Sequence, residues 1–189
     1  MPRKRDPQIE IRILDAAHQL WMKGGEGRLT MRAVARAAKT TTPTVYERFR
    51  DRRDILQSLR ERARMDQLRT IQPAQTALDA CFQFLKFAEA HHNEYRLLTA
   101  DWSERLARNA PKPAFELIKQ LLAKELGGTP EQHAVLALTL AELLHGAARM
   151  LIVDGVPDNV SQKLRHACRA GCEALIAHAK KAAQSNSKP

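Results

Sequence analysis

The sequence predicts an all-α protein, and three observations support this fold class. Only 5% of the 189 residues are aromatic, and a composition rich in Ala and Leu favours helices over sheets. Apolar residues recur at helical spacing along most of the chain. Gly and Pro lie mostly where these periodic segments end, as is typical of helix boundaries. We therefore expect about nine helices, in a chain long enough for one large or two small domains.

The charge of the chain is concentrated near its N-terminus. The formal net charge is +10 and the isoelectric point is near 10.0. Residues 1–69 carry 17 Lys and Arg against 9 Asp and Glu, a net charge of +8, whereas residues 70–189 carry only +2. A local excess of this kind indicates a polyanionic partner, either nucleic acid or an acidic membrane surface. The alternative is a basic face that is merely solvated.

The cysteines and the apolar segments indicate a soluble protein of the cytoplasm. Three cysteines, an odd number, lie in helix-like segments, at Cys81, Cys168 and Cys172, and predict buried packing residues in a reducing compartment. One helical turn offers only two soft ligands, so we expect no metal and no cofactor. No apolar run follows the basic start. The longest apolar stretch, residues 134–153, is interrupted by Glu142, His145 and Arg149, so a membrane span is not expected.

The first 69 residues predict four helices. Residues 1–7 are a basic tail, which could enter a DNA minor groove or serve only solubility. Residues 8–21 form the first helix, and Gly24 and Gly25 end it. Thr30 can cap the second helix, whose buried side contains Met31, Val34, Ala35 and Ala38. After a turn at residues 39–40, Thr41 can cap the third, and Asp51 the fourth, which continues to about residue 69.

Two helices joined by a tight turn suit insertion into the DNA major groove. The N-terminal residues of the second of these two helices meet the base edges, and here they are Thr41, Thr42, Pro43 and Thr44. Tyr46 and Arg48 lie further along, where they can reach phosphates or, for Arg48, a base. Phosphate contacts supply affinity that depends on salt but carry no sequence information. The pattern predicts a DNA-reading unit within residues 30–56.

The segment LTMRAVARAAKTTTPTVYERFRDRRDIL resembles the N-terminal domain of the TetR family of bacterial transcriptional regulators. The resemblance covers about residues 8–57. It implies an Ω-shaped all-α homodimer with a ligand-responsive C-terminal domain. It also implies that Thr30 and Tyr46 contact phosphates, that residues 41–44 face the groove, and that Arg52 occupies the place of a phosphate-binding Lys. Accordingly, we expect residues 1–57 to bind DNA and residues 58–189 to bind an effector and dimerise.

The sequence departs from the family pattern at the turn. Lys39 stands where Gly is usual, so a left-handed backbone there would be mildly strained. Thr40 replaces a small apolar residue.

Residues beyond 73 predict longer, more apolar helices, at about 74–91, 93–108, 113–126, 130–153 and 158–182. The resemblance implies that the last two pair with their copies in a homodimer. A stripe on the final helix contains small residues that permit close approach. Its members are Leu164, Cys168, Gly171, Cys172, Leu175 and Ala179.

Glu142, His145 and Arg149 form a polar stripe on an otherwise apolar helix. Two interpretations remain open. These residues can form a salt bridge within the helix or across the dimer. Alternatively, they line an effector pocket together with Phe82, Tyr95, Trp102 or Phe115. Mostly apolar walls with a few polar groups would suit a small hydrophobic or aromatic molecule.

The sequence therefore predicts a homodimeric, sequence-specific DNA-binding regulator. We expect a repressor that a small, largely apolar effector releases from a palindromic operator. Two alternatives are a DNA-binding regulator without an effector and a nonspecific, nucleoid-type DNA binder. The sequence contains no nucleophile motif, no carboxylates paired at catalytic spacing and no Gly-rich phosphate loop, so we do not expect an enzyme.

Overall fold

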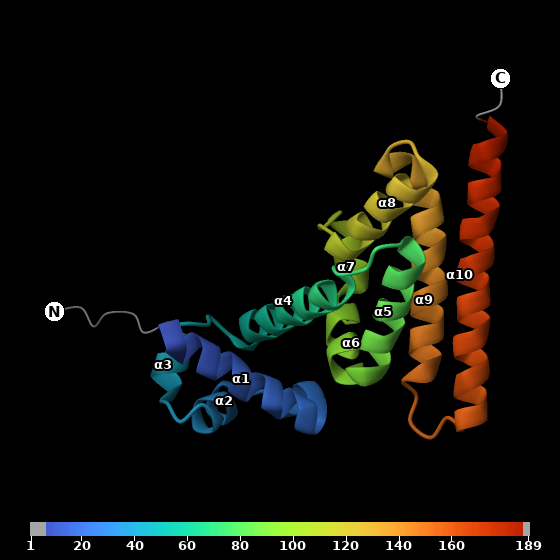
Figure 1. The fold of residues 1–189 in the computed structure, drawn as a ribbon. Coiled ribbons are helices and arrows are strands. Elements are labelled where there is room, and N and C mark those ends of the chain that lie inside the picture. Colours follow the sequence, from blue (N-terminus) through green and yellow to red (C-terminus); the bar gives the residue numbers. More distant parts are fainter. Residues whose placement is uncertain (1–6, 187–189) are drawn as a thin grey trace. The chain divides into compact units, whose positions relative to one another are not determined.

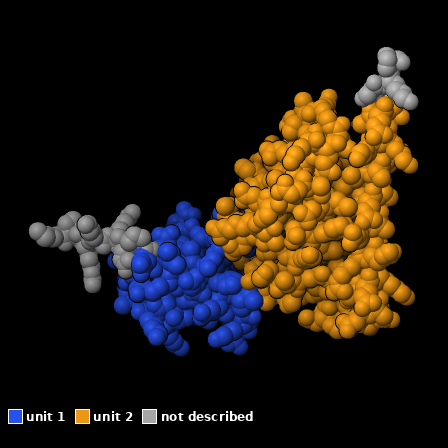
Figure 2. Space-filling view, viewed as in Figure 1, with its two compact units in different colours: residues 1–64 blue, residues 65–189 orange. Residues whose placement is uncertain are grey.

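The computed structural model describes residues 7–186, and within them it contains ten α-helices, two 3-10 helices and no strand (Figure 1). The predicted all-α fold is confirmed. The chain divides into two compact units, residues 1–64 and 65–189, which Figure 2 colours separately. The division expected after residue 57 falls inside a helix that contributes to both units. Apart from Pro7, the predicted basic tail lies outside the described residues.

Unit 1 contains three helices and the beginning of a fourth. These are α1 (Pro7–Gly24), α2 (Met31–Ala37), α3 (Thr42–Tyr46) and the first part of α4 (Arg52–Ile71), with the 3-10 helix η1 (Gly25–Arg28) after α1. Helix α2 packs on α1 and on α3 through side chains that water does not reach. The largest of these are Ile13, Leu29, Val34, Val45, Phe49, Ile55 and Leu59. Burial of this apolar surface holds helices that are too short to be stable alone.

Side-chain caps start these helices where the sequence predicts them. The Thr30 hydroxyl oxygen accepts a hydrogen bond of 3.1 Å from the Ala33 amide at the start of α2. The Asp51 carboxylate accepts one of 3.0 Å from the Asp54 amide at the start of α4. Each cap satisfies an amide that has no partner inside its helix. Both predicted caps are confirmed.

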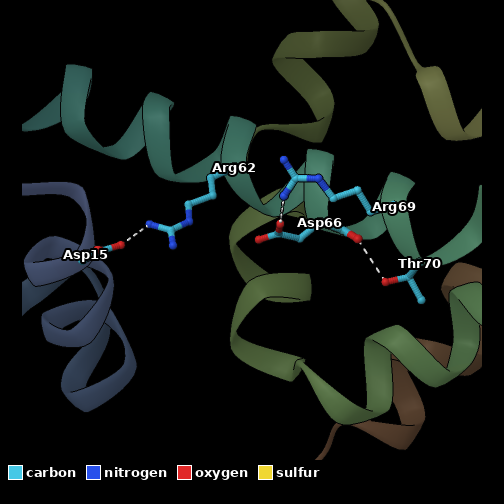
Figure 3. Close-up of polar contacts among 5 residues, drawn as sticks. All are labelled: Asp15, Arg62, Asp66, Arg69 and Thr70. Atoms are coloured by element: carbon cyan, nitrogen blue, oxygen red, sulfur yellow. Dashed lines mark hydrogen bonds and ion pairs between the residues drawn. The ribbon is translucent and has the colours of Figure 1, made fainter. Parts of the chain in front are cut away.

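An ion pair joins α4 to α1 within unit 1, and side-chain hydrogen bonds within α4 stabilise its last turns. Arg62 of α4 pairs with Asp15 of α1. Farther along, Arg69 donates to the Asp66 carboxylate at 2.9 Å, and the Thr70 hydroxyl donates to the Asp66 carbonyl at 3.0 Å (Figure 3). The Arg62–Asp15 pair is half-exposed, so it orients the two helices more than it stabilises them.

Unit 2 contains the end of α4 and six further helices. They are α5 (Ala77–Ala90), α6 (His92–Thr99), α7 (Trp102–Ala107), α8 (Pro113–Leu126), α9 (Ala134–Leu151) and α10 (Asp158–Asn186), with the 3-10 helix η2 (Pro130–His133) before α9. Helix α5 packs on α6, α8, α9 and α10, and α9 and α10 lie along each other (Figure 1). The core of the unit therefore lies around α5 and α9.

The prediction of a single helix at residues 93–108 is wrong, because the structure has two helices there. The Thr99 hydroxyl donates to the Tyr95 carbonyl at 2.9 Å, one turn back. The Ala100 amide turns to the Leu97 carbonyl, three residues back, instead of the carbonyl four residues back. A side chain that bonds the preceding turn and a tightened last turn both favour a helix end. Helix α6 accordingly stops at Thr99, and α7 starts at Trp102.

The three cysteines are free and buried in the core of unit 2, as the sequence predicts. A hydrogen bond between the two side chains, together with burial, raises the pKa of the Cys168 thiol next to Cys172. Thiols in such surroundings stay protonated and unreactive. They pack like small apolar side chains.

The small-residue stripe of α10 does not face outward, which corrects the expectation that it pairs with a second copy. Cys168 and Cys172 are buried, and Leu175 packs on the same core. A Cβ atom on Gly171 would come within 2.8 Å of the Leu143 side chain of α9. Leu164 and Ala179 are half-buried. This stripe therefore joins α10 to α9 of the same protomer.

The turn between α2 and α3 has the left-handed residue that the sequence predicts. Lys39 has a φ of 51°, and its amide donates to the Arg36 carbonyl at 3.2 Å. The next amide, that of Thr40, donates to the Ala35 carbonyl at 3.0 Å. These bonds close the end of α2 in the manner of a left-handed cap, a position that Gly occupies without strain.

We predict that Lys39→Gly raises the stability of unit 1. Removing the Cβ relieves strain of roughly 1–2 kcal/mol, and the greater freedom of Gly in the unfolded chain offsets about half of it. The net gain should be roughly 0.5–1 kcal/mol, measured by thermal unfolding followed by circular dichroism. Lys39→Ala removes the same charge but keeps the Cβ, so it should show no gain. Equal melting temperatures for the two variants would contradict this account.

Candidate nucleic-acid interface

Helix α3 begins with three threonines whose hydroxyl groups are not equivalent. The Thr41 oxygen accepts a hydrogen bond of 3.2 Å from the Thr44 amide and lies 2.8 Å from the Thr44 hydroxyl oxygen. Within residues 7–186, the Thr42 hydroxyl forms no hydrogen bond. Thr41 and Thr44 therefore hold the start of α3 together, whereas Thr42 keeps its full capacity to donate and accept. The sequence predicts the Thr41 cap, but not that the Thr44 hydroxyl is bonded to it while the Thr42 hydroxyl is not.

The orientation of α3 is fixed by apolar side chains on its inner face. Val45 is fully buried and Phe49 nearly so. On the outer face, Pro43 is exposed and the Tyr46 side chain is 54% exposed. Arg48 is half-buried. One side of α3 is thus anchored in unit 1, and the other presents a hydroxyl, a rigid ring and a phenol to a partner.

Arg52, expected to bind phosphate, has an ion-pair partner inside unit 1. Its guanidinium donates to the Glu26 carboxylate at 2.8 Å and to the Glu26 carbonyl at 3.5 Å. Both side chains are about half exposed. A surface pair of this kind is weak, so a DNA phosphate can share or replace the carboxylate. The role of Glu26 is absent from the sequence prediction, because no local pattern pairs residues so far apart.

Several further cations lie on α2, in the turn after it and around the start of α4, and form no ion pair among the described residues, although Arg50 and Arg53 flank the Asp51 carboxylate and act on its charge. Their side chains are exposed, and they are Arg32, Arg36, Lys39, Arg50 and Arg53. Arg32 and Arg36 are four residues apart on α2, so they project from the same face. Unpaired cations attract a polyanion more strongly than cations that are already neutralised. Helical spacing in the sequence could have identified the two arginines of α2.

All eight residues expected to bind DNA lie in unit 1. They are Thr30, Thr41, Thr42, Pro43, Thr44, Tyr46, Arg48 and Arg52. The Thr30 oxygen serves as the cap of α2, and its proton remains free to donate to a phosphate oxygen. Helix α3 is capped, anchored on its inner face and preceded by a tight turn, and cations without ion pairs lie nearby. These features together define a helix-turn-helix DNA-binding protein.

The comparison with known families agrees with this class. Residues 13–59 match the family model described as bacterial regulatory proteins, tetR family. Residues 13–59, which contain the helix-turn-helix, are accordingly similar to the DNA-binding domain of tetR-family regulators. A search of curated protein sequences finds no significant match.

Solved structures share the fold over nearly the whole chain. A TetR-like transcriptional regulator from Rhodococcus sp. RHA1 is 19% identical with a TM-score of 0.58, covering 92% of this chain and 96% of that one. A protein of unknown function from the same organism has 18% identity and a TM-score of 0.66, covering 94% and 98%. TetR from Acinetobacter baumannii AYE has 17% identity and a TM-score of 0.61, covering 89% and 95%. At these identities the likeness shows the fold alone.

Unit 2 contains a pocket of about 570 Å³. Its walls come from α6, from the start of α7, and from α9 with the two residues after it. They are Tyr95, Arg96, Thr99, Trp102, Glu142, His145, Arg149, Ile152 and Val153. Five of these are effector-site residues expected from the sequence, so the structure brings them together. Helical spacing from Tyr95 and Arg149 could have added Thr99, Ile152 and Val153.

Two of the expected pocket residues lie elsewhere. The Phe82 ring lies against the Arg169 guanidinium of α10, 4.7 Å from ring centroid to cation. The Phe115 ring lies against the Lys119 ammonium of α8, at 5.6 Å, and lines a separate hollow of about 500 Å³. Both rings are held by cations on their own sides of the unit. The prediction that Phe82 and Phe115 line the same pocket as Tyr95 is therefore wrong.

The floor of the pocket is a hydrogen-bonded pair of uncharged side chains. The Tyr95 hydroxyl lies 2.9 Å from Nδ1 of His145, whose ring is flanked by Phe84 and Trp102, each at 5.0 Å between ring centroids. Burial, and secondarily the nearby Arg149 cation, lowers the pKa of His145 to about 4. Burial likewise raises the pKa of Tyr95 to about 12. Both groups are neutral at pH 7.

The charged side chains of the polar stripe on α9, Glu142 and Arg149, do not pair with each other. Among the described residues, neither Glu142 nor Arg149 forms an ion pair or a side-chain hydrogen bond. The salt bridge within the helix is therefore not formed, whereas the alternative of a salt bridge across a dimer stays a prediction. Both charges stay available at the pocket.

We predict that Thr41→Ala destabilises unit 1 by about 1 kcal/mol, because it removes the cap of α3. Thr42→Ala should leave the stability almost unchanged, since its hydroxyl has no partner among the described residues. Chemical denaturation of the two variants measures the difference. Equal losses for both would show that the Thr41 cap does not hold the helix.

Proposed function

We propose that the protein is a homodimeric repressor that binds a palindromic operator through α3 and is released by a small molecule bound in unit 2. The observation that carries the proposal is the outer face of α3, where Pro43 and Tyr46 are exposed beside the half-buried, unbonded Thr42 hydroxyl, with exposed cations nearby in the chain. Base edges in the major groove can be read by hydroxyl groups and by apolar contacts to thymine methyl groups. The cations and the Thr30 and Tyr46 hydroxyls would position α3 on the phosphates.

The outer face of α9 and α10 supports dimerisation. Helix α9 with η2 is apolar and long enough to cross a membrane by length and composition alone, and only 28% of its most apolar window is buried. The same helix packs on α5, α8 and α10 and leaves one apolar side exposed. That side carries Val135, Leu138 and Met150. Exposed apolar surface of this kind marks a protein interface.

The exposed surface of α10 suits close packing against a second copy. Ala167, Ala170 and Ala174 are exposed and repeat at helical spacing, so a partner helix can approach the backbone. A symmetric dimer built on this face would present two copies of α3 to one operator. Half-sites about 34–36 Å apart then match one turn of DNA. The two-fold symmetry of such a dimer is what makes a palindromic operator the expected target.

The pocket of unit 2 supports regulation by an effector. It has a volume typical of small-molecule sites and a few polar groups in a partly aromatic wall. An effector that binds one conformation of the dimer better than another shifts the dimer toward it. The coupling requires that the favoured conformation bind DNA less well. Helix α4 belongs to both units, so a change in unit 2 reaches unit 1 through one continuous helix.

We predict that Thr42→Ala and Arg52→Gln weaken DNA binding in different ways. Arg52→Gln removes a phosphate contact, so it should weaken binding to all sequences and reduce the salt slope by about 1. Thr42→Ala should leave the slope unchanged and alter the preference among operator variants by about 1 kcal/mol. Fluorescence anisotropy between 50 and 200 mM salt measures both effects.

Lys124→Gln, which removes an exposed charge from unit 2, is the matched control and should leave the affinity unchanged. Equal losses on operator and random DNA for the Thr42 variant would favour a nonspecific, nucleoid-type binder. Tight operator binding that no small molecule weakens would favour a regulator without an effector.

We predict that Leu138→Glu converts the dimer to a monomer, because it places a charge in the apolar face of α9. Leu106→Glu is the control, since Leu106 of α7 is 50% exposed and Leu138 is 52% exposed. Sedimentation equilibrium should show a monomer for the first variant and a dimer for the second. A dimer for both would place the interface on another surface.

A further inference from the structure

The charges around the pocket of unit 2 are separated into two ends. Arg149 lies in the last turn of α9, and the Arg96 guanidinium donates at 3.2 Å to the carbonyl of Ile152, the residue that ends α9. The Arg96 guanidinium therefore lies at the C-terminal end of this helix, and the Arg149 cation extends from the last turn to within electrostatic reach of His145 and Tyr95. Arg149 has no ion-pair or hydrogen-bond partner among the described residues, so one cation at this end is unneutralised.

The opposite end of the pocket is acidic. Glu142 precedes Arg149 by seven residues, which is about 10 Å along a helix axis. Glu142 also lacks an ion-pair partner among the residues described. The two arginines and the one glutamate give the wall a net charge of +1, with the positive charge at one end.

The surface between the two ends is aromatic and uncharged. It consists of the Tyr95–His145 pair and the Trp102 ring, which lies 5.0 Å from the His145 ring between centroids. Neutral groups of this kind offer hydrogen bonds and a stacking surface without attracting a second charge. A flat apolar body fits here better than a charged one.

We propose that the pocket binds a small aromatic monocarboxylate, with its carboxylate on Arg149 and Arg96 and its ring against Trp102 and His145. Guanidinium groups pair with carboxylates through parallel hydrogen bonds. A second carboxylate at the far end of the same ligand would approach Glu142 and be repelled. The volume of about 570 Å³ accommodates a ligand with one or two fused rings. This inference names the chemical class of the effector and so rests on the proposed function.

The test compares matched probes with the intact protein. 2-Naphthoate carries one carboxylate, 2-naphthamide carries none, and naphthalene-2,6-dicarboxylate carries two at opposite ends. Isothermal titration calorimetry and thermal unfolding measure their binding. We expect 2-naphthoate to bind at least tenfold more tightly than either of the other two probes. Arg149→Gln should abolish this preference, whereas Arg108→Gln, on an exposed residue outside the pocket, should not.

Glu142→Gln provides a second and opposite readout. Removing the repelling carboxylate should restore binding of the dicarboxylate and change 2-naphthoate binding little. The inference is overturned if the amide binds as well as 2-naphthoate, if Arg149→Gln leaves 2-naphthoate binding intact, or if no probe binds. Anisotropy with operator DNA separates the two proposals. Carboxylate binding without release of DNA supports the ligand class and contradicts the effector role. Release of DNA by uncharged compounds alone supports the effector role and contradicts the ligand class.

Discussion

Helix α9 has more apolar surface than one protomer can cover, and the organisation of unit 2 follows from this constraint. One side of α9 packs on α5, α8 and α10 and supplies Leu140, Leu144 and Ala148 to the core. A second side carries His145 and Arg149 and forms a wall of the pocket. The remaining side, with Val135 and Leu138, is exposed. The core side holds the fold together, and the exposed residues, which adjoin the pocket wall, are those assigned to ligand binding and self-association in the proposed function.

Unit 1 depends on short-range constraints rather than on a large core. Helix α3 is only five residues long, so it would not persist in water alone. The Thr41 cap begins it, the left-handed Lys39 orients its approach, and Val45 and Phe49 hold its inner face. Because these features fix the backbone, the outer side chains can meet DNA with little loss of conformational freedom.

The sequence predicts most of unit 1 because local chemistry determines it. Caps at Thr30, Thr41 and Asp51 depend on residues three positions apart, and the strained turn is visible as a Lys where Gly would be relaxed. Contacts between distant residues are not visible in this way. The pairing of Arg52 with Glu26 depends on how η1 folds back toward α4.

The sequence predicts unit 2 less completely for the same physical reason. The polar stripe of α9 correctly indicates pocket residues because it interrupts an apolar helix. The sequence does not show that Phe82 and Phe115 lie outside the pocket. Their rings lie against cations of α10 and α8, and these contacts are not visible in the sequence. The small residues of α10 indicate close helix packing, but not whether the partner is α9 of the same protomer or of another.

In the proposed function, two copies of α3 read one operator at a spacing set by the dimer. A footprint of the protein on the DNA upstream of its own coding region tests this. We expect a single protected pseudo-palindrome whose two halves are one helical turn of DNA, or a small multiple of it, apart. Uniform protection of all sequences, or protection of one isolated half-site, would contradict it.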